Sequence, residues 1–147
     1  MLAHCTNPAD FIVKFNPDFC SERYNQFKTE ELALRSGMIK LHELKFIYLD
    51  DTATDLIQAW LANASLYVCL TINKQLIKEI SIELYKEIHM LNLSEVTLFF
   101  SKLKRGHYGV LYGRFDGMMI CSAAREYRQQ RGLILSRLPE DEQKQLM

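Results

Sequence analysis

The stretch from Glu95 to Arg131 reads EVTLFFSKLKRGHYGVLYGRFDGMMICSAAREYRQQR and decides how the chain is interpreted. It joins an apolar segment with helical spacing, a basic loop punctuated by glycines, and a second helical segment carrying three arginines. We expect the first helix to end near Lys104 and to stop at Gly106, because glycine commonly terminates helices. Asp116 is a suitable N-cap for a last long helix that runs from Gly117 towards Leu138.

The composition is that of an ordinary globular protein. Of the 147 residues, 48% are hydrophobic and 24% are charged, which argues against disorder. We expect one helical domain over residues 1–147, an all-α compact bundle of about five helices. Hydrophobic spacing and caps predict the helices over 17–35, 56–68, 74–91, 95–104 and 117–138. In the helix after Asn73, the predicted buried stripe contains Leu76, Ile77, Ile80, Leu84, Ile88 and Leu91.

The two ends and one internal segment carry weaker patterns. Residues 1–15 are expected to form an extended arm or short turn packed on the body, and residues 139–147 a polar C-terminal tail. Residues 38–49 fit a short helix or a strand equally well. If they form a strand, it needs a partner, and a short β-hairpin with the N-terminal arm is one possibility.

Charge is distributed unevenly along the chain. The total is zero, yet residues 102–137 contain eight Lys or Arg and two acids, a net charge of +6, so the remainder carries −6. Such asymmetry is typical of proteins with a polyanionic partner or of charge-driven contacts between proteins. The total charge by itself indicates no partner.

The basic region also contains aromatic side chains next to glycines. Flat rings that stack on bases, together with cations that contact phosphates, are how single-stranded nucleic acid is held. We therefore predict a nucleic-acid-binding surface made of Lys104, Arg105, His107, Tyr108, Tyr112, Arg114, Arg125, Arg128 and Arg131. Two alternatives remain open. The tyrosines can fold back onto the helical core, and the arginines can pair with Glu126 or with acids on other helices.

No pattern indicates catalysis, a cofactor or a metal. The glycine loop lacks GxxxxGK[ST] and the dinucleotide fingerprint. The four cysteines form no CxxC pair, and the four histidines show no HExxH spacing, so we expect no zinc site and no enzymatic activity. The N-terminus lacks a signal-peptide pattern and no apolar run is long enough to span a membrane, which favours a cytoplasmic protein without a membrane partner.

Residues 98–131 resemble the signature of a family of small uncharacterised bacterial proteins that also occur on mobile elements and phages. The family pattern is an apolar helix ending in LFF, then FKxGxYGxFYGxxD, then an apolar helix with Ala-Leu-Arg and a final Arg. Gly117 departs from it, since relatives often have proline there. The similarity extends loosely back to Trp60 and implies a helical fold and a bacterial or phage setting, but no activity. The matching residues are Leu98, Phe99, Phe100, Lys104, Gly106, Tyr108, Gly109, Tyr112, Gly113, Asp116, Ile120, Ala123, Arg125, Tyr127 and Arg131.

Two functions are consistent with these patterns. The first is a non-catalytic, nucleic-acid-associated accessory protein that binds DNA or RNA through the basic segment. The alternative is a protein-interaction or structural module, such as a phage-encoded adaptor or virion component. In that case the acidic remainder of one copy can meet the basic segment of another, giving self-association.

Overall fold

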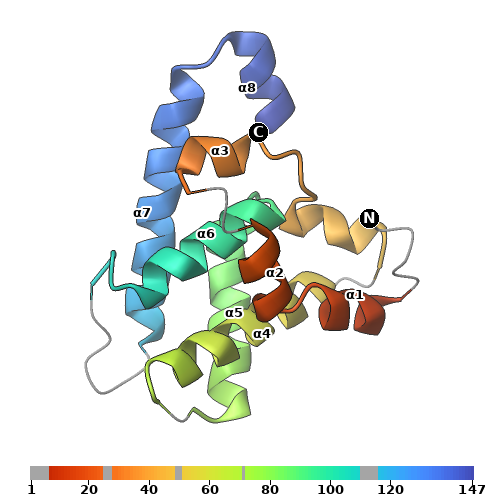
Figure 1. The fold of residues 1–147 in the computed structure, drawn as a ribbon, viewed down its shortest axis with the longest axis vertical. Helices are drawn as coiled ribbons and strands as arrows, with labels where there is room; N and C mark the ends of the chain where they lie inside the picture. Colours follow the sequence, from red (N-terminus) through yellow and green to blue (C-terminus); the bar gives the residue numbers. More distant parts are fainter. Residues whose placement is uncertain (1–6, 25–27, 49–50, 71, 110–115) are drawn as a thin grey trace.

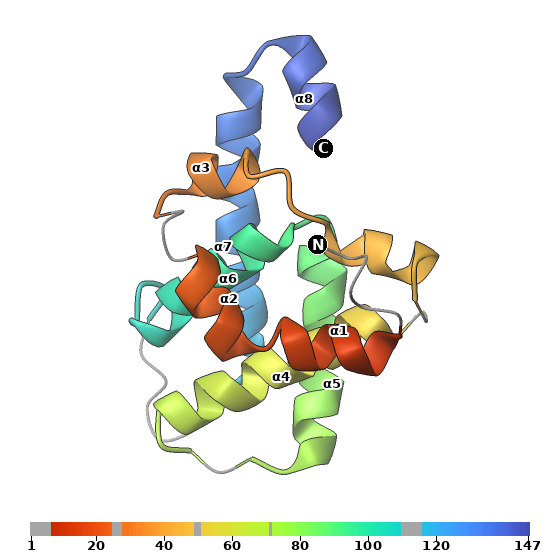
Figure 2. The same ribbon diagram turned by 45° about the vertical axis from the view of Figure 1, so that its right-hand side comes forward.

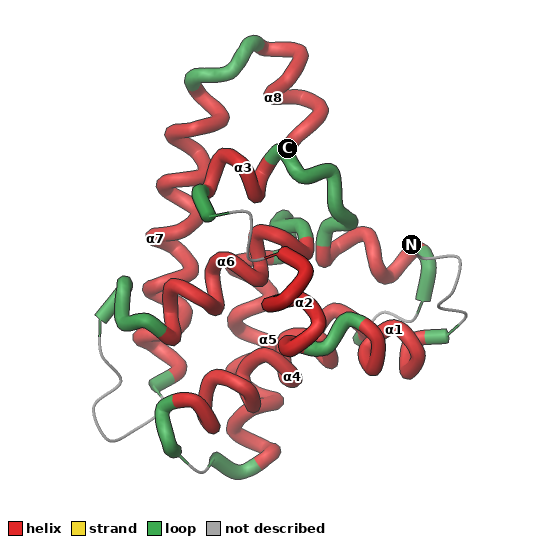
Figure 3. Tube along the Cα trace, viewed as in Figure 1, coloured by secondary structure: helices red, strands yellow, loops and turns green. Residues whose placement is uncertain are grey.

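The computed structural model describes residues 7–24, 28–48, 51–70, 72–109 and 116–147. Within these ranges the chain is all-α, as predicted, but it contains more helices than the five expected (Figure 3). The elements are α1 Pro8–Lys14, α2 Pro17–Tyr24, α3 Glu30–Leu34, the 3₁₀ helix η2 Leu41–Phe46, α4 Thr52–Tyr67, α5 Lys74–Ile88, α6 Leu93–Lys104, α7 Gly117–Ser136 and α8 Glu140–Leu146.

Helix α6 lies at the centre of the fold. All residues from Leu91 to Phe100 are buried, and α2, α3, α4 and α7 contact α6 from different sides (Figures 1 and 2). Phe100 stacks on Trp60 of α4 with ring centroids 5.1 Å apart. Because this segment is buried around its circumference, the other elements are arranged around it.

A reciprocal capping box fixes the start of α6. The Asn92 side chain accepts a hydrogen bond from the Glu95 backbone N–H at 2.9 Å, and the Glu95 carboxylate accepts one from the Asn92 N–H at 3.1 Å. The Asn92 amide also donates to the carbonyl of Ala33 at 3.0 Å. The cap therefore satisfies helix-end groups and connects α6 to α3.

The N-terminal segment is helical where it is described, so the prediction of an extended arm over residues 1–15 is wrong for residues 8–14. Asn7 caps α1 and Pro8 occupies its first turn, the same Asn-Pro start signal that Asn16 and Pro17 give for α2. Phe11 and Phe15 are fully buried, with ring centroids 4.8 Å apart. Burial of these two rings attaches α1 to the body.

The helix predicted over residues 17–35 is two helices. Thr29 caps a separate α3, accepting from the N–H of Leu32 at 3.3 Å. Threonine competes with a continuous helix because its hydroxyl bonds to a nearby backbone N–H. The second helix can therefore start in a new direction.

Of the two alternatives for residues 38–49, the short helix is found, but as the 3₁₀ helix η2 over residues 41–46 and not as an α-helix or a strand of a hairpin. Lys40 makes an isolated antiparallel bridge with Asn92, and η2 follows immediately. The N–H of Leu41 donates to Leu91 O at 2.9 Å, and the N–H of Leu93 donates to Ile39 O at 3.0 Å. The extended backbone thus finds its partner just before α6, not in the N-terminal segment, and the described residues contain no β-hairpin.

The last nine residues differ from the predicted polar tail because residues 140–146 form α8. The helix is polar and contains no buried residue. It folds back beside the end of α7 (Figure 1), and Glu142 pairs with Arg35 at 3.2 Å. In the described part of the chain, no helix combines the length and apolar character needed to cross a bilayer.

Candidate interaction surface

Two of the predicted nucleic-acid-binding residues, Tyr112 and Arg114, lie outside the described residues. Lys104 packs against α4. Its Nζ donates to Asn63 Oδ1 at 3.0 Å and lies 5.7 Å and 5.5 Å from the ring centroids of Trp60 and Tyr67. Burial lowers the pKa of Lys104, partly opposed by the charge of Asp18. This ammonium is directed at aromatic rings instead of an open surface.

Tyr108 lies against the core, as the first of the two alternatives expects. Its ring centroid is 5.7 Å from that of Phe99, and burial raises the pKa of its hydroxyl. His107 meets it edge-on at 4.8 Å but is itself exposed. Arg105, the C-cap residue that follows α6, is also exposed. Only these last two of the described loop residues have exposed side chains that could contact a polyanion.

The arginines of α7 contact two different carboxylates. Arg125 Nη1 and Arg128 Nη1 lie 3.3 Å and 2.8 Å from the two oxygens of Glu87 on α5. Both guanidinium groups are largely exposed, and Glu87 bridges them. The pairing matches the second alternative, with a carboxylate on another helix as the partner.

Arg131 is inside the protein. Its Nε lies 2.8 Å from Glu95 Oε2, with side chains only 7% and 1% exposed. Its Nη2 also donates to Leu146 O at 3.0 Å and to Met90 O at 3.4 Å. Burial raises the pKa of Glu95, and the charge of Arg131 and the Asn92 N–H oppose that rise. A helix turns by about 100° per residue, so Arg131 lies about 120° around α7 from Arg125. The seven predicted residues that the structure describes therefore do not share one exposed face.

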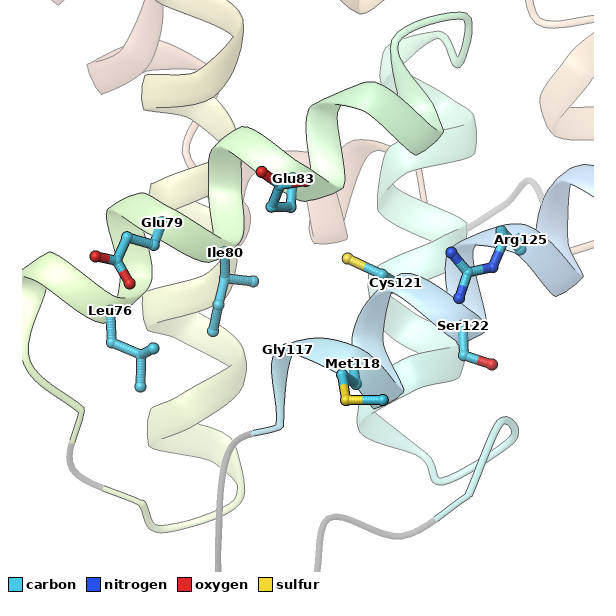
Figure 4. Close-up of a pocket in the computed structure, with 9 residues that line it drawn as sticks. All are labelled: Leu76, Glu79, Ile80, Glu83, Gly117, Met118, Cys121, Ser122 and Arg125. Atoms are coloured by element: carbon cyan, nitrogen blue, oxygen red, sulfur yellow. The ribbon is translucent and has the colours of Figure 1, made fainter.

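A different surface feature lies between α5 and α7. It is a groove of about 510 Å³ (Figure 4). Its lining comes from the N-terminal part of α5 and from the first turns of α7. The lining residues are Leu76, Glu79, Ile80, Glu83, Gly117, Met118, Cys121, Ser122 and Arg125.

Gly117 lets the two helices approach closely at this point. A Cβ atom placed on Gly117 would lie 3.1 Å from Cγ1 of Ile80, tighter than ordinary van der Waals contact. Ile80 is buried and forms the apolar floor. A side chain at position 117 would require Ile80 to shift by a few tenths of an ångström, so the glycine favours the close approach of α7 to α5 at this point.

The groove combines exposed apolar side chains with charges on opposite walls. Met118 is 82% exposed and Leu76 is 39% exposed. On the α5 wall, Glu79 accepts a hydrogen bond from Gln75 at 3.4 Å, and Glu83 pairs with Lys86 at 3.1 Å. Arg125 stands on the α7 wall (Figure 4). Such a surface can take an apolar side chain flanked by a cation.

Cys121 is half-buried in the groove wall. Burial raises the pKa of its thiol, and the charge of Glu87 adds to the effect. A thiol with a raised pKa is protonated at neutral pH and is a weak nucleophile. In the described residues, no three His, Cys, Asp or Glu side chains are grouped so that they could hold a metal ion.

The sequence interpretation missed this groove because it placed Leu76 in the buried stripe of α5. The stripe is real from Ile80 onward, since Ile80, Leu84 and Ile88 are buried. Leu76 lies one turn earlier, where α7 begins at Gly117 and no longer covers α5. Two adjacent methionines, Met118 and Met119, at the start of α7 were the available signal, since methionine is common on adaptable binding surfaces.

Comparison with known proteins identifies one family. The model of a family of unknown function, DUF6633, matches residues 70–145, which include α5, α6, α7 and most of α8. No curated protein and no solved structure gives a significant match. The family match covers more than half of the chain, so the chain belongs to this family.

Proposed function

We propose that this member of the DUF6633 family is a non-catalytic protein-interaction module that binds a protein segment in the α5–α7 groove. The observation that carries the proposal is the groove itself. It places two exposed apolar side chains, Met118 and Leu76, beside a carboxylate, Glu79, that interacts with an uncharged amide. We further propose the setting indicated by the sequence signature, a cytoplasmic adaptor encoded by a bacterium, phage or mobile element.

The chemistry of the groove supports binding of a peptide segment. Methionine and leucine side chains in a concave site provide apolar contact area, and a few charges at the rim fix orientation. All nine lining residues lie inside the region that the family model matches. Of the described residues outside that region, including those of α1 and α2, none lines the groove.

Selection of random peptides on the intact chain tests the proposal. We expect the enriched peptides to pair a large apolar residue with Lys or Arg, and to bind in fluorescence anisotropy. Leu76→Glu should weaken a selected peptide at least about tenfold, because it places a charge on the apolar wall. Leu133→Glu is the matched control, since Leu133 is an exposed leucine that does not line the groove. Equal binding by both variants, or no enriched peptide, would reject the proposal.

Association with nucleic acid is the second candidate function, and one observation favours it. Two partly exposed guanidinium groups of α7 share the single carboxylate of Glu87, so this ion-paired group of three side chains has two positive charges and one negative charge. The proposed contacts among the described residues are Arg105, His107, Arg125 and Arg128. Labelled DNA and RNA oligonucleotides should then bind at low salt, with an affinity that falls steeply as salt rises. Unchanged mobility of both probes at micromolar protein and low salt would reject this candidate.

A further inference from the structure

We infer that the occupant of the α5–α7 groove is a second copy of the same chain, docked through a two-fold symmetric contact. The inference rests on the proposed interaction function and names its partner. In a two-fold dimer one patch must complement itself, so each copy has to offer both a projecting group and a site that receives it. The groove and its rim have both.

Met118 is the projecting group. Its side chain is 82% exposed and stands at the rim of the groove, beside the half-exposed thiol of Cys121 and the apolar floor (Figure 4). In a two-fold contact the methionine of each copy enters the hollow of the other. Methionine suits this role because its unbranched thioether adapts to an irregular apolar site.

The charges of the groove are also self-complementary. Carboxylates line the α5 wall and a guanidinium stands on the α7 wall, so a two-fold axis that runs between the two walls, and not across them, sets each acidic wall against the other copy's basic wall. Glu79, whose described partner is the Gln75 amide, can then pair with Arg125 of the second copy.

Arg125 can make such a contact without leaving Glu87 unpaired. Glu87 has a nearer cation in Arg128, at 2.8 Å against 3.3 Å for Arg125. If Arg125 turns to the second copy, Glu87 stays paired. The formal net charge of the whole chain is zero, so two copies approach without overall repulsion.

Sedimentation analysis of the full chain over a range of concentrations tests the inference. One groove per copy makes a small interface, so we expect a reversible dimer with a dissociation constant on the order of micromolar or weaker. Met118→Glu should raise that constant at least about tenfold, because it inserts a charge into the apolar contact. Leu133→Glu should leave it unchanged.

Charge reversal gives the sharper test. Glu79→Arg and Arg125→Glu should each weaken self-association, because each places like charges opposite one another. An equimolar mixture of the two variants should dimerise, because every contact in the mixed pair joins opposite charges. Circular dichroism of each variant verifies that the helices are intact.

A chain that stays monomeric at every concentration would overturn the inference, as would a mixture no more associated than its components. The chain can also prove monomeric and still bind a selected peptide, with that binding lost in Leu76→Glu. This result would reject the second copy as the occupant, while the proposed interaction function stands. A dimer that is unaffected by Met118→Glu and by both charge reversals places self-association elsewhere and also rejects the inference.

Discussion

Helix α7 makes two arginine–glutamate contacts that use the same residue types but differ in solvent exposure. Arg125 and Arg128 hold Glu87 at the surface, with guanidinium side chains 56% and 43% exposed. Arg131 holds Glu95 in the interior, with both side chains nearly inaccessible. The comparison shows that neighbouring arginines of one helix have different roles, decided by what packs over each one.

The energetic consequences differ as well. An exposed ion pair contributes about 0–1 kcal/mol, since water and salt screen it. A buried pair contributes little relative to an apolar replacement, but removing one member costs about 3–5 kcal/mol because an uncompensated charge is left inside. The two sites should therefore respond very differently to the same substitution.

The largest expected effect comes from Arg131→Met. It leaves Glu95 buried without its cation and removes the hydrogen bonds to Leu146 O and Met90 O. We expect the free energy of unfolding in urea to fall by about 3–5 kcal/mol. Arg125→Met is the matched control, with an expected loss below about 1 kcal/mol. Similar losses in the two variants would show that the two sites do not differ in this way.

Replacing both buried partners should recover most of that loss. The double variant Arg131→Met with Glu95→Leu removes the charge that the single substitution leaves unpaired. We expect a remaining deficit of about 1 kcal/mol, because Glu95 also closes the capping box with Asn92. Urea unfolding of the single and double variants measures the difference. A double variant no more stable than Arg131→Met would mean that the pair stabilises the fold through its attraction.

The pH dependence of the Arg131→Met variant should be a smaller effect. Burial already raises the pKa of Glu95, and loss of Arg131 removes a charge that lowers it. A carboxyl group with a raised pKa in the folded state binds its proton more tightly there than in the unfolded state. Its contribution to the free energy of unfolding is therefore full at low pH and is lost as pH rises. Relative to the native sequence, the variant should gain about 1 kcal/mol between pH 8 and pH 5. Unfolding curves at both pH values measure it.

A matched variant separates Glu95 from the other acids. In Arg131→Met combined with Glu95→Gln, the deficit relative to the native sequence should stay nearly constant between the two pH values. If that deficit varies as much as in Arg131→Met alone, another group titrates and the assignment to Glu95 is wrong.

The smallest expected change in stability is that of Glu87→Gln, below about 1 kcal/mol. Its informative result lies in binding, because it frees both exposed guanidinium groups. If nucleic acid binds here, affinity at low salt should rise and the slope of log K against log salt should steepen by about one charge. Electrophoretic mobility shift measures both. An unchanged affinity would separate these arginines from any nucleic-acid contact.

The sequence predicted the ends of helices well where a capping residue or a glycine sets them. Asn73 and Asp116 cap α5 and α7 as expected from their side chains. Gly106, with φ of 77°, ends α6 at the predicted place. Cys69 follows α4 with φ of 60°, a conformation that costs a non-glycine residue about 1–2 kcal/mol. The hydrophobic spacing predicted the end of this helix near Val68, but no glycine occupies the strained position, so packing around the loop must offset the cost.

The sequence by itself determined that the chain is helical and where α5 and α7 start, and it placed the start of α6 within two residues. These properties depend on caps and apolar spacing within a few residues of each position. Only the tertiary structure decided which arginines are buried, that Lys104 faces aromatic rings, and that α5 and α7 leave a groove. The reason is physical: Glu95 and Arg131 are 36 positions apart, and Glu87 and Arg128 are 41 apart. Such contacts depend on how whole helices pack.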